Sequence, residues 1–145
     1  MTPEQRTACR NIEREGYKLN GEVNELRADQ SRLRELRATA ISVINTNKRE
    51  ITRLQRDRLT ACLPGTRSSK RHRSDDFFEG IEVYGCIQKI TRIDRQISKL
   101  QAGLRELQDR LLTYDRDLET LRRRIAGKEA LFLILRQQKQ QHGCP

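Results

Sequence analysis

Four cysteines have the most distinctive chemistry in this sequence. Cys9, Cys62, Cys86 and Cys144 contain no Cys-x-x-Cys pair. Structural zinc modules use closely spaced ligands, so this spacing argues against a metal centre. Thiols remain reduced in the cytosol, whereas an oxidising compartment lets them pair. The chemistry expected of them is therefore either none or disulfide formation, and the fold decides which pairs meet.

The other residue types that commonly serve catalysis are isolated. His72 and His142 lack an Asp or Cys partner at helical spacing, and the sequence has no Gly-rich phosphate loop. No serine stands in a Gly-x-Ser-x-Gly setting. Asp75-Asp76 is typical of a helix cap, and Asp115 with Asp117 is typical of a solvated helix face. We therefore expect no enzyme, no cofactor, no metal and no small-molecule substrate.

Basic side chains cluster at two places. The first lies between residues 67 and 73 and is termed the basic linker cluster. It has three competing interpretations: a nuclear-import signal, a contact to phosphates, or a solvated loop. The second is a triplet of arginines, where the i,i+4 spacing of Glu119 to Arg123 favours pairing within a helix instead. The basic linker cluster contains Arg67, Lys70, Arg71 and Arg73, and the arginine triplet contains Arg122, Arg123 and Arg124.

The composition narrows the class of fold that must position these residues. The chain has 145 residues, a net charge of +10, 34% apolar residues and no Trp. A compact α/β enzyme needs more apolar residues than this, since globular domains contain roughly 45–50% when Gly is counted as well. Ala, Glu, Leu, Lys and Arg make up about half of the chain, which is typical of long helices and coiled coils. No apolar run approaches the ~18 residues that a membrane span requires.

An apolar heptad repeat organises the second half of the chain. From Val83 onward, seam residues alternate at spacings of three and four over about seven heptads, and Lys128 alone breaks the pattern. This period predicts a helix over 75–142 that supercoils with a partner helix. Gly143 and Pro145 suit its end. The core of the predicted coiled-coil seam is Ile90, Ile93, Ile97, Leu100, Leu104, Leu107, Leu111, Leu118, Leu121 and Ile125.

A second helix is predicted over 3–62, with Thr2 as its cap and Pro3 in its first turn. Its apolar stripe is less regular, because several seam positions hold polar residues or glycine. Polar seam residues either fix the register and oligomeric state of a coiled coil or mark loose packing. The stripe contains Ile12, Leu19, Val23, Leu26, Leu33, Ala40, Ile44, Ile51, Leu54 and Ala61, interrupted by Gly16, Gln30, Arg37, Asn47 and Arg58.

Two helices of similar length around one polar linker, 63–74, predict an all-α fold. The simplest arrangement is a single antiparallel coiled-coil hairpin over 1–145, which self-association could extend into a bundle. Folding the chain back near residue 72 brings Cys62 opposite Cys86 and places Cys9 and Cys144 together at the open end. A Cys62–Cys86 disulfide is the pairing that this register favours, and a Cys9–Cys144 disulfide is the weaker prediction.

The segment 130–135 is apolar around almost the whole helix, and such a helix is buried rather than solvated. It either thickens the core beside Cys9 and Ile12 or forms a docking or oligomerisation surface. Five residues are the candidate docking segment: Leu131, Phe132, Leu133, Ile134 and Leu135.

These features predict a non-enzymatic coiled-coil protein that binds a protein partner, a second copy, or both, as a scaffold, adaptor or structural component. One alternative is a basic protein that associates weakly with nucleic acid through the linker and the surface arginines and lysines. Another is a component of a secretion apparatus or a virion whose cysteines become oxidised.

In outline, the predicted hairpin looks like the export-stalk proteins of flagellar and type III secretion systems. It also looks like the small helical partners of secreted bacterial toxins, and in both cases the likeness is one of fold alone. The N-terminus lacks the apolar stretch of a signal peptide, so an intracellular location is the expectation, and the basic linker cluster adds the nucleus as a candidate.

Overall fold

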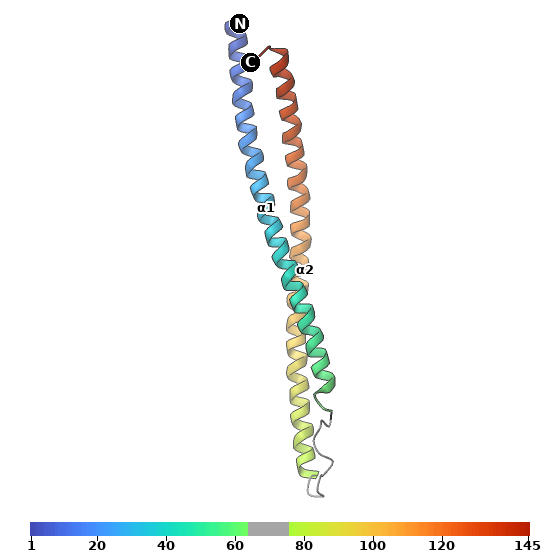
Figure 1. The fold of residues 1–145 in the computed structure, drawn as a ribbon. Helices are drawn as coiled ribbons and strands as arrows, with labels where there is room; N and C mark the ends of the chain where they lie inside the picture. The colour runs from blue at the N-terminus through green and yellow to red at the C-terminus, as the bar shows by residue number, and fades with distance from the viewer. Residues whose placement is uncertain (64–75) are drawn as a thin grey trace. The chain divides into compact units, whose positions relative to one another are not determined.

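Two long helices make up the protein in the computed structural model. It describes residues 1–63 and 76–145, and among these the side chains outside residues 76–82. Helix α1 spans Pro3–Thr60 and helix α2 spans Asp76–Gln141, and the described residues contain no strand (Figure 1). The all-α helical hairpin predicted from the sequence is confirmed. Both helices end within two residues of the predicted bounds, and all but the first residue of the predicted linker lies outside the described residues.

Helix α1 begins with a reciprocal cap. The Gln5 backbone N–H donates to the Thr2 hydroxyl at 3.2 Å, and the Thr2 N–H donates to the Gln5 side-chain oxygen at 2.9 Å. The first N–H groups of a helix have no partner within the helix, so these two bonds satisfy donors that would otherwise need water. Pro3, which has no N–H to satisfy, occupies the first helical position.

Helix α2 ends in a turn that redirects the chain. The Cys144 N–H donates to the Lys139 carbonyl at 3.0 Å, and the Gly143 N–H donates to the Gln140 carbonyl at 3.1 Å. Gly143 adopts a φ of 64°, a left-handed conformation that costs glycine little because it has no Cβ. This Schellman arrangement ends the helix and positions Cys144 for the disulfide described below.

The chain forms two units, and each contains one segment of α1 and one segment of α2. Unit 1 combines Met1–Thr39 with Leu111–Pro145, and unit 2 is Ala40–Arg110. In unit 1, Glu22 pairs with Lys128 while the later Arg37 pairs with the earlier Asp115. Partners in α2 thus move towards the N-terminus as those in α1 move towards the C-terminus, which makes the two segments antiparallel.

The core of unit 1 is a single row of interlocked aliphatic side chains. Leu26, Leu121 and Ile125 are buried against one another, and Leu33 packs at the edge of this cluster. Leu19 and Val23 extend the row along α1. Neighbouring residues of the row stand three, four or seven positions apart on their helix, so all of them face the partner segment.

Unit 2 has a core of the same kind. Ile51 and Leu54 from α1 form a buried cluster with Ile93 and Ile97 from α2, and Ala40 and Ile44 are also buried. Partly buried Ala61, Leu100 and Leu104 pack against the cluster.

The residues of the predicted seam in α2 lie at the helix interface to differing degrees. Four are buried: Ile93, Ile97, Leu121 and Ile125. The other six are half-buried: Ile90, Leu100, Leu104, Leu107, Leu111 and Leu118. Two facing helices cover only one side of each seam residue, so the flanks of these six remain open to water.

Candidate functional site

The charged residues at seam positions of the described helices each meet an opposite charge on the facing helix. An ion pair between half-exposed groups contributes little to stability. It does select a register, because a shift of the helices would leave the charge without its partner. The pairs are Arg37–Asp115 and Lys128–Glu22 in unit 1, both at 2.6 Å, and Arg58–Asp94 in unit 2 at 2.7 Å.

The Lys128–Glu22 pair explains the one break in the predicted seam of α2. The hydrogen bond from Lys128 lowers the pKa of the Glu22 carboxyl below its ordinary value of 4.5. The two side chains are the least exposed of the ion pairs that the described residues form, at 32% and 34%. Lys128 is therefore a seam residue with a specific partner on the facing helix.

All four cysteines form disulfides. Cys9 is joined to Cys144 in unit 1, and Cys62 is joined to Cys86 in unit 2. The Cα–Cα distances are 5.7 Å and 5.4 Å, which lie within the roughly 4.4–6.8 Å usual for disulfides. The first disulfide holds the two chain ends together in unit 1 (Figure 1).

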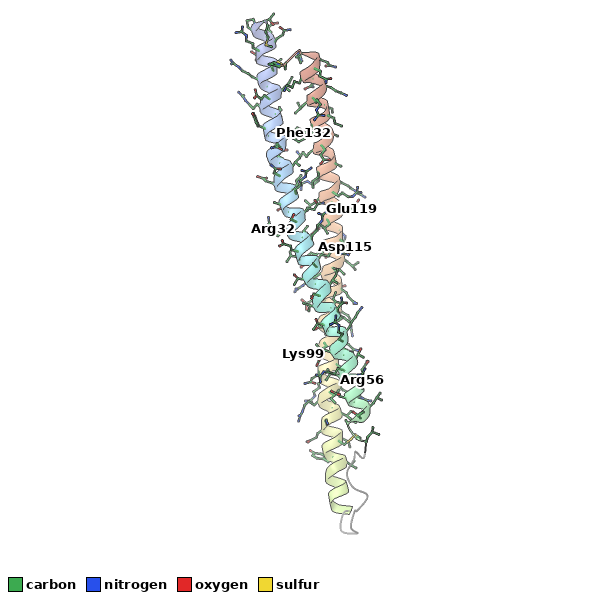
Figure 2. All side chains as sticks on the ribbon, in the orientation of Figure 1. Arg32, Arg56, Lys99, Asp115, Glu119 and Phe132 are labelled. Carbon is green, nitrogen blue, oxygen red and sulfur yellow. A yellow bond between two sulfur atoms is a disulfide. The ribbon has the colours of Figure 1, made fainter. Side chains whose placement is uncertain are left out.

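A cleft of about 590 Å³ opens between α1 and α2 in unit 1, next to the Cys9–Cys144 disulfide. We term it the terminal cleft. Its apolar lining comes from Ile12 of α1 and from Phe132 and Leu135 of α2, all of which are half-buried. Phe132 extends from α2 towards α1 (Figure 2). In the buried clusters, seam residues of the two helices pack against each other. At this end of unit 1, the seam residues Ile12, Phe132 and Leu135 line a cleft instead.

One seam position beside the cleft has no side chain. Gly16 lines the cleft, and a Cβ built on it would meet no atom within 4 Å. At the buried seam positions of α1, such as Leu19, Val23 and Leu26, an aliphatic side chain packs in the interface. The absence of one side chain thus leaves Phe132 and Leu135 without a complete partner surface.

The rim of the terminal cleft is basic. Arg10 lies on the α1 side, and Arg136 and Lys139 lie on the α2 side, against the single acid Glu13. An apolar floor with a polar rim of one prevailing charge is typical of a site that binds an amphipathic segment.

The candidate docking segment divides between the cleft and its surroundings. Phe132 and Leu135 line the cleft. Leu131, Leu133 and Ile134 are exposed to 44%, 58% and 48% of their surfaces. Thickening of the core does not account for these three, since most or nearly half of each side chain faces water.

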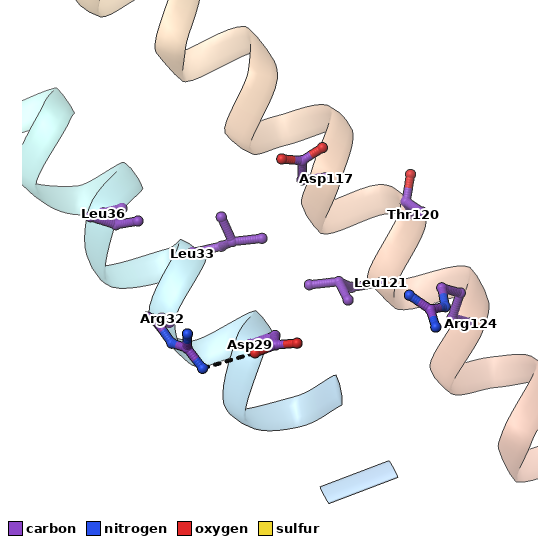
Figure 3. A pocket seen from close by; sticks show the side chains of 8 residues that line it. All are labelled: Asp29, Arg32, Leu33, Leu36, Asp117, Thr120, Leu121 and Arg124. Atoms are coloured by element: carbon purple, nitrogen blue, oxygen red, sulfur yellow. Dashed lines mark hydrogen bonds and ion pairs between the residues drawn. The ribbon is translucent and has the colours of Figure 1, made fainter. Parts of the chain in front are cut away.

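A second cleft of about 460 Å³ lies elsewhere in unit 1 (Figure 3). Leu33 and Leu121 point towards each other across its floor, and Arg32 is paired with Asp29 at 2.9 Å. Acidic, basic and hydroxyl side chains form much of its wall. The second cleft therefore offers a smaller apolar surface than the terminal cleft. Its lining residues are Asp29, Arg32, Leu33, Leu36, Asp117, Thr120, Leu121 and Arg124.

Glu119 holds two residues of the arginine triplet. Arg122 donates to its carboxylate at 2.6 and 2.9 Å, and Arg123 donates at 3.2 Å. The hydrogen bond from Arg122 is the main reason that the pKa of Glu119 falls from 4.5 to about 2. Arg124 lines the second cleft. The triplet is thus less available to an external anion than its sequence suggests.

The basic linker cluster, Arg67, Lys70, Arg71 and Arg73, lies outside the described residues. Within the described residues, no group of His, Cys, Asp and Glu is arranged to hold a metal ion. In the same part of the chain, neither helix has a stretch that is long and apolar enough to cross a membrane.

Sequence reasoning missed the polar rim of the terminal cleft and the role of Gly16. Arg10, Glu13, Arg136 and Lys139 look like ordinary surface residues of a charged helix. The available signal was a glycine at a seam position of one helix, at a distance from the hairpin turn comparable to that of the apolar segment of the other.

Comparisons of the chain with protein-family models, with curated proteins and with solved structures found no match. The terminal cleft is therefore interpreted from its own residues.

Proposed function

We propose that the protein is a non-enzymatic assembly protein whose terminal cleft binds an apolar helical segment of a partner protein. One observation carries the proposal: Phe132, Leu135 and Ile12 line an open cleft instead of packing together. The cleft volume of about 590 Å³ falls within the roughly 300–1,000 Å³ of ligand-binding clefts. The exposed Leu131 and Leu133 extend the apolar surface next to it.

The rim argues for an acidic partner rather than a second copy. Three cations against one acid surround the cleft, so two copies that met face to face would bring like charges together. A segment with leucines on one side and glutamates beside them would fill the floor and pair with Arg10, Arg136 and Lys139. Self-association, which the sequence also predicts, remains the competing outcome of the test.

The disulfides support an oxidising location for this activity. Disulfides persist in oxidising compartments and are rare in the cytosol. A chain whose four cysteines are all paired is better suited to an oxidising compartment than to the intracellular location expected from the N-terminus. A virion surface and the periplasmic or extracellular part of a secretion apparatus both meet this condition.

Filling the cleft tests the proposal. Gly16→Leu places an aliphatic side chain in the empty space, so we expect it to stabilise unit 1 and to abolish partner binding. Gly21→Leu is the matched control, because Gly21 is an exposed glycine of the same helix whose Cβ also meets nothing. Both variants gain about 1 kcal/mol of helix propensity, and only the first occludes the cleft.

The ligand in this test is a fluorescent amphipathic peptide with leucines at i, i+3, i+4 and i+7 and glutamates on its flanks. We expect it to bind the wild type and Gly21→Leu but not Gly16→Leu, and we expect a peptide with lysines in place of the glutamates to bind none of them. Equal binding of the peptide to both variants would contradict the cleft as the site. Sedimentation above 17.0 kDa that Gly16→Leu abolishes would instead identify a second copy as the occupant.

A further inference from the structure

The outer face of α2 in unit 2 carries cations that are not paired with any acid among the described residues. Arg92, Arg95 and Lys99 are exposed, and their spacing of three and four residues places them on one side of the helix (Lys99 is labelled in Figure 2). This side is opposite the one that buries Ile93 and Ile97. We term it the outer cationic face.

The acids of this region are already engaged. Asp94 is the single acid between residues 83 and 105, and it is paired with Arg58 of α1 at 2.7 Å. Arg53, on α1, is similarly held by Glu50 and Asp57. By contrast, Arg92, Arg95 and Lys99 form no ion pair with any described residue. All three side chains are also exposed.

A shallow recess marks the centre of this face. It has a volume of about 320 Å³ and is lined by Ile87, Gln88, Thr91, Arg92 and Arg95. The Thr91 hydroxyl donates to the Ile87 carbonyl of its own helix at 2.9 Å. The polar groups left to meet a ligand are two guanidinium groups and one carboxamide, beside the aliphatic side chain of Ile87. Guanidinium groups bind phosphate oxygens through paired N–H donors, so the recess suits an oxyanion.

An aromatic ring stands on the same side of the helix. Tyr84 is 64% exposed, and it precedes Arg92 by eight residues, a rise of about 12 Å. Proteins that bind single-stranded nucleic acid combine cations that follow the backbone with aromatic rings on which bases stack. Tyr84 and the three cations have this combination on one continuous helix face.

We propose that the outer cationic face binds single-stranded nucleic acid, with phosphates on Arg92, Arg95 and Lys99 and a base stacked on Tyr84. The site is distinct from the basic linker cluster and from the arginine triplet, and it does not depend on the terminal cleft. A sulfated polysaccharide or an acidic peptide would use the cations equally well. Only a nucleic acid supplies both phosphates and flat bases, so the ring and the cations together favour it.

The test measures binding of a fluorescent oligothymidylate to the full chain by anisotropy, over a series of salt concentrations. Replacing the three cations should lower the affinity and reduce the slope of log K against log salt by about 2, since each single-strand phosphate contact contributes about 0.7. The control removes the same charges from exposed positions of α1 in unit 1 and should leave the slope nearly unchanged. The test variant is Arg92→Gln, Arg95→Gln and Lys99→Gln, and the control variant is Arg6→Gln, Arg14→Gln and Lys18→Gln.

Substitution of Tyr84 distinguishes nucleic acid from other polyanions. Tyr84→Leu should weaken oligothymidylate binding by about 5- to 150-fold with the salt slope unchanged, and Tyr84→Phe should retain binding. Heparin and polyglutamate binding should not depend on Tyr84. The proposal is overturned if Tyr84→Leu leaves oligothymidylate binding unchanged, if it weakens heparin binding equally, or if the control variant loses as much affinity as the test variant.

Discussion

Removal of the disulfides is the perturbation whose effect can be calculated most directly from the structure. Cys9 and Cys144 are 135 residues apart in sequence, and Cys62 and Cys86 are 24 apart. A cross-link stabilises a protein chiefly by restricting the unfolded chain, and its effect grows with the logarithm of the loop that it closes. Serine variants of each pair therefore test the pairing and its energetic effect at once.

Loop-closure entropy gives the expected magnitudes. Loss of the Cys9–Cys144 disulfide should lower the free energy of unfolding by about 5 kcal/mol, and loss of the Cys62–Cys86 disulfide should lower it by about 3.5 kcal/mol. The shorter cross-link lies within the longer loop and reduces the larger figure by only a few tenths of a kcal/mol. The free energy of unfolding of a whole domain is about 5–15 kcal/mol. A protein that lacks both disulfides should therefore be largely unfolded or only marginally stable.

The assay is urea unfolding followed by circular dichroism, on the wild type and on the two double serine variants. Peptide mapping without reduction should first recover Cys9 linked to Cys144 and Cys62 linked to Cys86, one of three connectivities that four cysteines allow. Four free thiols or a crossed connectivity would refute the structural basis of the calculation. Serine variants as stable as the wild type would refute the energetic reasoning.

Three further outcomes follow from individual contacts. The pKa of Glu119 is lowered to about 2, so its stabilising contribution is complete above pH 4.5 and is lost as the pH falls towards 2. Thermal melts across this range should show a falling melting temperature, and Glu119→Gln should make that fall smaller. Lys128→Leu should raise the melting temperature by roughly 2–4 °C, because an aliphatic seam residue gains about 1 kcal/mol from burial, and a lower melting temperature would show that the pair with Glu22 matters more. Gly143→Ala should cost about 1–2 kcal/mol in urea unfolding, because its φ of 64° is unfavourable for alanine, whereas Gly127→Ala, within α2, should be stabilising.

The fold could be predicted because it depends on the spacing of apolar residues, which is visible in the sequence itself. Ile93 and Ile97 belong to an apolar repeat that is visible in the sequence, and both are buried in the structure. The outer ends of the two helices could also be predicted. Thr2 is a common residue type before a helix and Gly143 a common one after it, and both have these roles in the structure. Such signals lie within a few residues of one another, so they require no knowledge of the partner helix.

The terminal cleft and the ion pairs depend on register, which the sequence of either helix alone does not specify. Gly16 and Leu135 lie 119 positions apart in sequence and line the same cleft, while Lys128 finds Glu22. A shift by a few residues would change every such pair while leaving both apolar stripes intact. Pairing within one helix also changes what the sequence suggests. Arg122 belongs to a cluster of three arginines in the sequence, but in the structure it donates to Glu119 of the same helix.

The irregular positions of the seam differ in how the structure compensates for them, and the proposed binding site rests on this difference. Arg37, Arg58 and Lys128 each meet a carboxylate across the interface, so their cost is offset within the protein. Gly16 is not compensated in this way, because nothing fills the space beside it. A two-helix core has few apolar contacts, and an unfilled seam position is a loss that a partner could recover. The same reasoning applies to charge: Arg37 and Arg58 pair across the helices, whereas Arg92 and Arg95 form no ion pair with a described residue, which is why we propose that they bind a ligand.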